Sequence, residues 1–121
     1  MLDEAYISTL ATEQAFQFLS GVVPFSFLPD EEIENVAGKL SIVHYPKGSI
    51  ICIQGQTKLD YLYIIQRGAA ERYYEEGEQK RLRGLLGEGD IYGGITLLVN
   101  DSIAVRTLKC TEDCYFYILP K

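Results

Sequence analysis

The sequence predicts a mainly β protein, an antiparallel β-roll of the double-stranded β-helix or jelly-roll type, with helices at its N-terminus. Apolar residues occur at helical spacing in the first third of the 121-residue chain. From residue 40 onward, short runs of β-branched and aromatic residues alternate with glycine-containing turns. Because these runs recur about every 8 to 12 residues with few helices between them, they favour a closed or double-sheet antiparallel barrel over an α/β sheet.

Two helices are expected before the roll. Residues 12–20 carry apolar side chains at helical spacing and stop at Gly21, a residue type that accepts the left-handed turn after a helix. A second helix is expected to begin at Pro29, and the acidic residues that follow suit the positive end of the helix dipole. Its expected buried stripe consists of Ile33, Val36, Ala37 and Leu40.

Seven strands are expected after the helices, separated by turns rich in glycine, proline and polar residues. Residues 1–121 are therefore one domain, with helices over 1–40 and the β-roll over 40–119. Because the chain stops directly after a strand, we expect it to be a segment of a longer protein. The strands are expected at Leu40–Tyr45, Ser49–Ile53, Tyr61–Gln66, Ala69–Tyr74, Leu82–Leu86, Ala104–Cys110 and Cys114–Leu119.

The charge and cysteine content narrow the class of partner. The chain has 11 Lys plus Arg against 17 Asp plus Glu, a net charge of −6. This balance argues against nucleic acid or an anionic membrane as a partner, because both require positive surface. The three cysteines, Cys52, Cys110 and Cys114, are an odd number and no leader peptide precedes them, which favours a cytoplasmic location. No apolar run approaches the roughly 20 residues needed to cross a bilayer.

Catalytic and metal-binding patterns are absent from the sequence. His44 is the one histidine, so a histidine-based metal site cannot be assembled, and we expect it to be an ordinary residue of the barrel wall. Cys110 and Cys114 fall short of a zinc signature and are expected to be small core residues. No nucleophile, phosphate-loop or dinucleotide motif occurs. We expect no catalytic residue, no metal and no resident cofactor.

The segment from Gly87 to Leu98 is the candidate for binding. A strand ends in a glycine turn, and Gly93 and Gly94 then open a short apolar run that is long enough for one or two helical turns. Backbone N–H groups at such a helix start can hold an anion. Two glycines before an apolar run are also typical of a tight barrel corner, so the pattern alone leaves both interpretations open.

The order of strands and turns resembles the cyclic-nucleotide-binding domain family over about Phe16 to Leu119. The similarity is carried by the runs 45–51, 54–55, 61–65 and 68–71, and by the pattern Gly87-x-Gly-Asp-x-Tyr92-Gly93. The resemblance implies a β-roll in which a short cassette helix presents backbone amides to the cyclic phosphate of a nucleotide.

The cassette departs from the family pattern at both of its defining side chains. Typical members read Phe-Gly-Glu-x-Ala and later Pro-Arg-x-Ala, where the Glu accepts a hydrogen bond from the ribose 2′-hydroxyl and the Arg pairs with the phosphate. Here Tyr92-Gly93 matches Phe-Gly, but Gly94 stands in the place of the acid. The arginine position falls on Ile103 when counted forward and on Ala104 when counted backward.

Arg106 is the residue expected to compensate. In a strand Ala104, Arg106, Leu108 and Cys110 share one face, and this mostly apolar set should point inward. Arg106 would then stand inside the pocket or at its mouth, within reach of an anion. The alternative is an arginine at the rim or paired with a carboxylate such as Asp101. In either case the guanidinium needs an anionic or carbonyl partner. The expected ligand-binding residues are Gly93, Gly94, Ile95, Thr96, Ala104, Val105 and Arg106.

A narrower resemblance concerns the opening run Phe18–Pro29. It is similar to the start of bacterial signalling proteins in which this domain precedes a pair of CBS domains and a nucleotidyltransferase region. The resemblance implies that C-terminal domains of the same chain are partners, with a homodimer as a further option, and that any transferase chemistry belongs to the parent protein rather than to this chain.

Two functions remain open at this point. The first is a regulatory ligand-sensing module for a cyclic nucleotide or another anionic nucleotide-like effector. The second is a ligand-free interaction or assembly domain that retains the fold. An assembly domain should show the pocket filled, by Tyr92 or Ile103, and an apolar patch exposed elsewhere.

Overall fold

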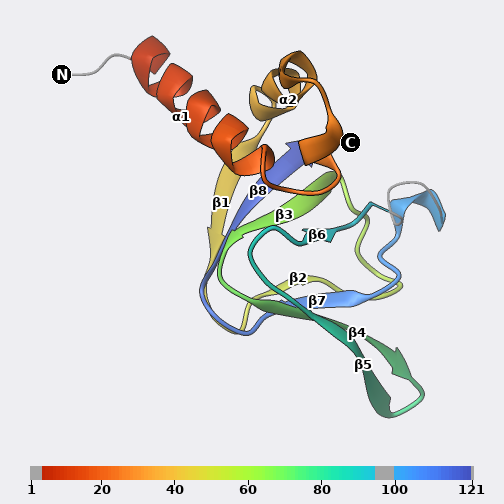
Figure 1. Cartoon of the computed structure of the whole chain (residues 1–121). Helices are drawn as coiled ribbons and strands as arrows, with labels where there is room; N and C mark the ends of the chain where they lie inside the picture. The colour runs from red at the N-terminus through yellow and green to blue at the C-terminus, as the bar shows by residue number, and fades with distance from the viewer. Residues whose placement is uncertain (1–3, 95–99, 121) are drawn as a thin grey trace. The chain divides into compact units, whose positions relative to one another are not determined.

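The computed structural model describes residues 4–94 and 100–120 of the chain (Figure 1). The chain divides into two compact units, residues 1–41 and residues 42–121. The first unit holds the two α-helices of the described residues, and the second holds almost all of the strands.

The helical unit contains α1 (Glu4–Leu19), the short 3-10 helix η1 (Phe25–Phe27) and α2 (Asp30–Ala37), and α1 packs against α2. Helix α1 begins earlier than the expected residue 12, because no glycine or proline interrupts residues 4–19. Helix α2 has Pro29 as its N-cap and three acidic residues in its first turn. Of its expected stripe, Ile33 and Ala37 are buried, and Val36 and Leu40 are half-buried.

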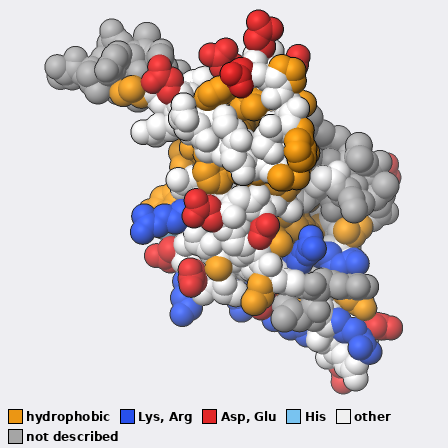
Figure 2. Space-filling model, in the orientation of Figure 1, with side chains coloured by type: hydrophobic (Ala, Val, Ile, Leu, Met, Phe, Trp, Pro, Cys, Tyr) orange, Lys and Arg blue, Asp and Glu red, His pale blue; other side chains and the backbone are white. Residues whose placement is uncertain are grey.

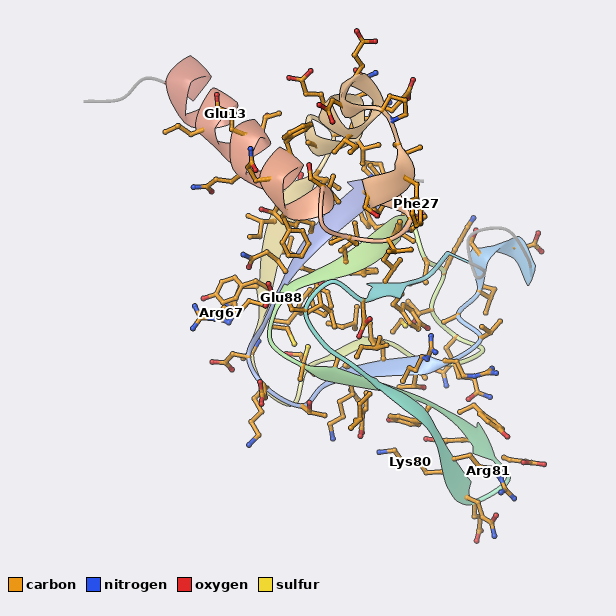
Figure 3. All side chains as sticks on the ribbon, viewed as in Figure 1. Glu13, Phe27, Arg67, Lys80, Arg81 and Glu88 are labelled. Atoms are coloured by element: carbon orange, nitrogen blue, oxygen red, sulfur yellow. The ribbon has the colours of Figure 1, made fainter. Side chains whose placement is uncertain are left out.

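Some apolar side chains of the helical unit are exposed. Phe27 is 80% exposed and Val23 is 64% exposed, and Leu28 is also exposed (Figure 3). Figure 2 shows acidic side chains beside apolar ones on this unit. No helix in the described part of the chain is long and apolar enough to span a membrane.

The second unit is a β-roll of two four-stranded sheets, as the sequence predicts (Figure 1). One sheet has the order β1-β8-β3-β6 and the other the order β2-β7-β4-β5, and the strand pairs whose registers are resolved are antiparallel. The strands are β1 (Ser41–Tyr45), β2 (Ile50–Cys52), β3 (Tyr61–Arg67), β4 (Ala70–Glu76), β5 (Gln79–Leu86), β6 (Ile91–Tyr92), β7 (Thr107–Cys110) and β8 (Cys114–Pro120).

Strands β4 and β5 form a long hairpin that extends away from the other strands (Figure 1). Charged side chains pair across it: Lys80 with Glu71 at 2.9 Å, and Arg81 with Glu76 at 3.1 Å (Figure 3). The Lys80 ammonium also lies 4.0 Å from the centre of the Tyr73 ring. Strand β5 is an edge strand of its sheet.

The expected strand Ala104–Cys110 is too long, because the ladder of β7 begins only at Thr107. Thr107 was expected to point outward, yet it is 4% exposed, and its hydroxyl accepts a hydrogen bond from the backbone of Gln54 at 3.0 Å. The simple alternation of faces from Ala104 to Cys110 is therefore wrong. Strand β6 was not predicted, because a strand of two residues is too short to show an alternation of apolar and polar side chains.

The core of the roll is apolar and aromatic. Phe116 is fully buried, and the rings of Tyr45 and Tyr63 meet it edge to face at 5.8 and 5.7 Å between ring centres. These contacts join neighbouring strands of one sheet, since Tyr45 lies on β1, Phe116 on β8 and Tyr63 on β3. The partly exposed wall shows the same kind of packing, because His44 on β1 stacks on Tyr115 with ring centres 4.7 Å apart.

The three cysteines are buried free thiols, which confirms the expected place of Cys110 and Cys114 in the core. Burial raises the pKa of the Cys110 thiol to about 12, and its neighbour Cys114 adds to the effect.

Gly68 occupies the tightest turn. It has a φ of +107°, and a Cβ atom there would collide with the carbonyl oxygen of Asp113 and lie 3.0 Å from the Cα atom of Cys114. Gly48 has a φ of +90° but open space around it. An alanine at Gly48 would lose stability only through its backbone conformation, whereas an alanine at Gly68 would also collide with neighbouring backbone atoms.

We expect Gly68→Ala to destabilise the protein more than Gly48→Ala. Gly48→Ala should lose about 1–2 kcal/mol from left-handed strain alone, and Gly68→Ala should lose at least about 1 kcal/mol more because the backbone of Asp113 must move. Urea denaturation of both variants measures the two losses. Equal losses would show that Gly68 is needed only for its dihedral angles.

The Cys110 thiol should make stability fall at alkaline pH. Its pKa is raised in the folded state, so the unfolded chain loses this proton at lower pH than the folded chain does. The contribution is fully present below about pH 9 and is lost as pH rises toward about 12. Urea denaturation between pH 8 and pH 11 should show a steeper loss for the natural protein than for Cys110→Ala. Parallel slopes would contradict the assignment.

Candidate anion-binding site

The entry to the cassette is built by a turn and a short strand. In the turn, the Gly87 amide donates to the Asp90 carboxylate at 2.8 Å, and the Asp90 amide donates back to the Gly87 carbonyl at 3.0 Å. Strand β6 follows and pairs with β3, Tyr92 lying opposite Tyr63. The expected glycine turn is therefore present and delivers the chain to Gly93.

Gly93 is a glycine because the chain bends there. Its φ is +107°, and a Cβ atom would lie 3.4 Å from the Tyr61 carbonyl oxygen and 3.5 Å from a methyl group of Leu59. At Gly94 the nearest atom to a Cβ would be a methyl group of Leu62 at 3.9 Å. The other expected cassette residues, Ile95 and Thr96, and the expected helical turns lie outside the described residues.

The exit from the cassette is tied to the segment 55–59. Leu59 donates its amide to the carbonyl of Ser102 at 2.8 Å, and Ala104 donates its amide to the carbonyl of Thr57 at 2.8 Å. Gly55 in turn donates to the Ala104 carbonyl at 2.8 Å. Ala104, expected to bind ligand, is 1% exposed, and its amide is already engaged. This amide is therefore not available to an anion.

Arg106 stands at the bend between this tied segment and β7. Its Nη1 donates to the carbonyl of Val105 at 2.7 Å, and its guanidinium lies 4.9 Å from the centre of the Tyr74 ring on β4. The side chain is half-buried. The expectation that the guanidinium has a carbonyl or anionic partner is confirmed by Val105. Among the described residues, Arg106 forms no ion pair with Asp101.

The backbone beside Arg106 offers donors. The amides of Val105 and Arg106 donate to no other residue that the structure describes. The two N–H groups and the guanidinium come from adjacent residues at one bend. A cluster of this kind can bind an anion through charge-assisted hydrogen bonds.

Tyr92 fills the interior next to this bend. Its ring is 5% exposed, and its hydroxyl donates to the Arg106 carbonyl at 2.6 Å. The thiol of Cys52 lies 3.3 Å from the same hydroxyl, to which it donates. Burial raises the pKa of Tyr92 well above its ordinary value. Ile103, the other residue expected to fill the pocket of an assembly domain, is half-buried.

Lys58 is a candidate site residue that the sequence did not predict. It lies directly opposite Ile103 in an isolated antiparallel bridge. The flanking hydrogen bonds make this a non-hydrogen-bonded pair, in which the two side chains stand close together on one face. Lys58 is exposed and forms no ion pair within the described part of the chain. No sequence signal reveals the pairing, because the two residues are far apart along the chain.

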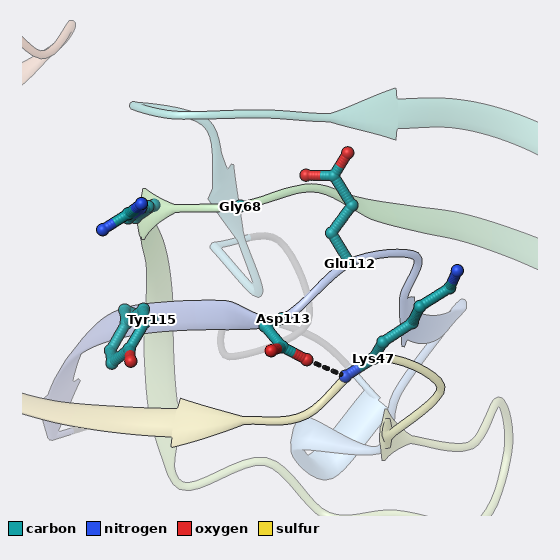
Figure 4. A pocket seen from close by; sticks show the side chains of 6 residues that line it. Lys47, Gly68, Glu112, Asp113 and Tyr115 are labelled. Atoms are coloured by element: carbon teal, nitrogen blue, oxygen red, sulfur yellow. Dashed lines mark hydrogen bonds between the residues drawn. The ribbon is translucent and has the colours of Figure 1, made fainter.

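A second hollow lies beside Arg67, at the end of β3 away from Gly93 (Figure 4). Its volume is about 530 Å³, and the Asp113 carboxylate beside it accepts a hydrogen bond from the Lys47 amide at 2.7 Å. Two cations and two carboxylates balance within it, so it has no preference for an anion. Its lining residues are Lys47, Arg67, Gly68, Glu112, Asp113 and Tyr115. No group of three His, Cys, Asp or Glu side chains suited to a metal ion occurs among the described residues.

Solved structures that share the fold include regulatory and sensor domains. The regulatory domain of Toxoplasma gondii PKA with cAMP matches at a TM-score of 0.86 and 21% identity, over 98% of this chain and 45% of that one. The regulatory subunit of a cAMP-independent protein kinase A from Trypanosoma cruzi, bound to guanosine, matches at 0.84 and 24% identity, over 93% and 40%. The sensor domain of the transcriptional regulator DNR from Pseudomonas aeruginosa matches at 0.79 and 15% identity, over 90% and 73%.

These identities establish the fold alone, and the chain spans less than half of these two protein kinase A structures. A comparison with curated protein sequences found no match. The family model "Cyclic nucleotide-binding domain" matches residues 42–121, which include every strand except the first residue of β1. The chain therefore belongs to the cyclic nucleotide-binding domain family.

Proposed function

We propose that the chain is the regulatory ligand-sensing module of a bacterial signal-transduction protein and binds an anionic nucleotide-like effector in a degenerate cassette. The observation that carries the proposal is the bend at Val105 and Arg106, where the Arg106 guanidinium contacts the Val105 carbonyl and the two backbone amides donate to no other described residue. The cassette comprises Gly93, Gly94, Ile95, Thr96, Ala104, Val105 and Arg106, with Ala104 contributing a small buried wall rather than an amide.

The chemistry of the cluster suits a phosphate or a similar anion. A guanidinium and two amides supply several donors in a half-buried setting, where each charge-assisted bond is worth roughly 1.5–3 kcal/mol. Gly94 provides no carboxylate for a ribose hydroxyl, so recognition of the sugar is expected to be weak. The Trypanosoma cruzi relative is bound to guanosine, and nucleosides therefore belong among the candidate ligands.

Regulation requires an output. An effector shifts an equilibrium only if it binds two arrangements of the protein with different affinity. In the proposed parent, the arrangement that changes lies in C-terminal domains of the same chain, a CBS pair and a nucleotidyltransferase region in the cytoplasmic proteins that the run Phe18–Pro29 resembles. A homodimer would offer a second route for the same output.

One observation favours the second function, a ligand-free assembly domain. Tyr92 occupies the interior beside the cassette, as that function predicts, and Phe27 and Val23 present apolar surface on the helical unit. The family glutamate and arginine are also absent from their usual places. The two functions make opposite predictions for ligand titration.

Arg106→Ala should abolish effector binding while Arg67→Ala leaves it unchanged. Arg67 is a matched control, because it is an exposed arginine on the same β-roll but lies at the second hollow. Isothermal titration with cAMP, cGMP, cyclic dinucleotides, AMP, ATP, guanosine and inorganic phosphate tests all three proteins. Saturable binding that only Arg106→Ala removes supports the sensor. If the natural protein binds no member of the panel, the result supports the assembly domain.

Lys58→Gln should weaken the binding of a phosphate-bearing effector less severely than Arg106→Ala does. Lys58 is exposed, so its contribution is mainly long-range attraction, and a loss of about 2- to 5-fold in affinity is expected. The effect should shrink as salt rises from 50 to 300 mM, because salt screens exposed charges. Lys47→Gln is the control at the second hollow. Equal losses for the two lysine variants would remove Lys58 from the site.

A further inference from the structure

The hydroxyl of Tyr92 joins the two described ends of the cassette. Tyr92 is the last residue of β6 and directly precedes Gly93, where the chain turns into the cassette. Arg106 is the residue at which the chain leaves the bend and enters β7. The 2.6 Å hydrogen bond from the Tyr92 hydroxyl to the Arg106 carbonyl therefore closes the cassette at its base.

This bond is buried and uses the backbone of the arginine itself. Tyr92 is 5% exposed and Cys52 is 1% exposed, so water does not compete well for the carbonyl. The Cys52 thiol lies 3.6 Å from the same carbonyl and 3.3 Å from the hydroxyl. The Arg106 carbonyl is consequently held from inside the roll, while the Arg106 guanidinium contacts the Val105 carbonyl and the Tyr74 ring.

A phenylalanine would fill the same space without this bond. A side chain that adds a polar atom to an apolar interior must satisfy it. Here the atom is satisfied by the one backbone carbonyl whose placement decides where the Arg106 side chain begins.

We propose that Tyr92 is a positioning residue, whose hydroxyl fixes the backbone of Arg106 and so prepares the guanidinium and the adjacent amides for an anion. The part of this inference that concerns affinity rests on the proposed function. The part that concerns Arg106 itself does not, because the bond joins two residues of the chain. Preorganisation of this kind lowers the cost of ordering the site when a ligand binds.

The test uses Tyr92→Phe, which removes one oxygen atom and keeps the ring. Relaxation of the Arg106 Nε–H group, measured by nuclear magnetic resonance on the ligand-free protein, should show greater mobility in Tyr92→Phe than in the natural protein. Tyr63→Phe is the matched control, because it makes the same change in the buried tyrosine opposite Tyr92 and leaves the Tyr92–Arg106 bond in place. It should leave the Arg106 relaxation close to that of the natural protein.

Titration with whichever member of the nucleotide panel binds gives the second measurement. Tyr92→Phe should weaken binding by about tenfold, the loss of one buried hydrogen bond. In an Arg106→Ala background the same change should have little further effect, because the group that it positions is gone.

Unchanged Arg106 relaxation in Tyr92→Phe would overturn the inference, whether or not a nucleotide binds. Equal mobilisation by Tyr92→Phe and Tyr63→Phe would also overturn it, since it would indicate general loosening of the core. If the natural protein binds no member of the panel but Tyr92→Phe alone mobilises Arg106, the proposed function fails and the positioning role stands.

Discussion

A hydroxyl group inside an apolar interior needs a partner, and this requirement organises the side of the roll where β6 ends and β7 begins. The core consists of aliphatic, aromatic and thiol side chains, and no buried side-chain nitrogen or oxygen among the described residues lacks a hydrogen bond. Tyr92 meets the requirement with the Arg106 carbonyl, which brings the start of β7 beneath the end of β6. The two strands belong to different sheets, so the same bond ties the sheets together where the cassette begins and ends.

Much of the fold follows from local patterns, and the parts that do not are non-local. Helix α2 and strands such as β3 are indicated by the short-range spacing of their apolar residues. This is why their positions were predicted within a few residues. The true start of β7 depends on the pairing of Ser102 and Ala104 with the segment 55–59, which no local pattern reveals. The length of α1 was underestimated because its N-terminal half lacks a regular apolar stripe, although nothing in it breaks a helix.

In the candidate site, too, local features were predictable from the sequence and contacts between distant residues were not. The glycine turn that leads to Gly93 and the need of the Arg106 guanidinium for a partner were predictable from residue chemistry. The hydroxyl contact of Tyr92 and the position of Lys58 opposite Ile103 were not, because each joins residues that the sequence separates. The alternation that placed Arg106 failed in detail, since the chain bends at Val105 instead of continuing as a strand.

The β4–β5 hairpin has a practical consequence. Its tip holds Gly77, with a φ of +64° and open space around it, while Tyr74 lower on the same hairpin lies under the Arg106 guanidinium. The backbone ladder of β4 and β5 continues to the pair Glu76 and Gln79, and two ion pairs cross it below the tip. A fluorescent group inserted between Gly77 and Glu78 would thus leave the roll intact and remain mechanically connected to the arginine, which makes the hairpin a natural grafting point for an optical biosensor.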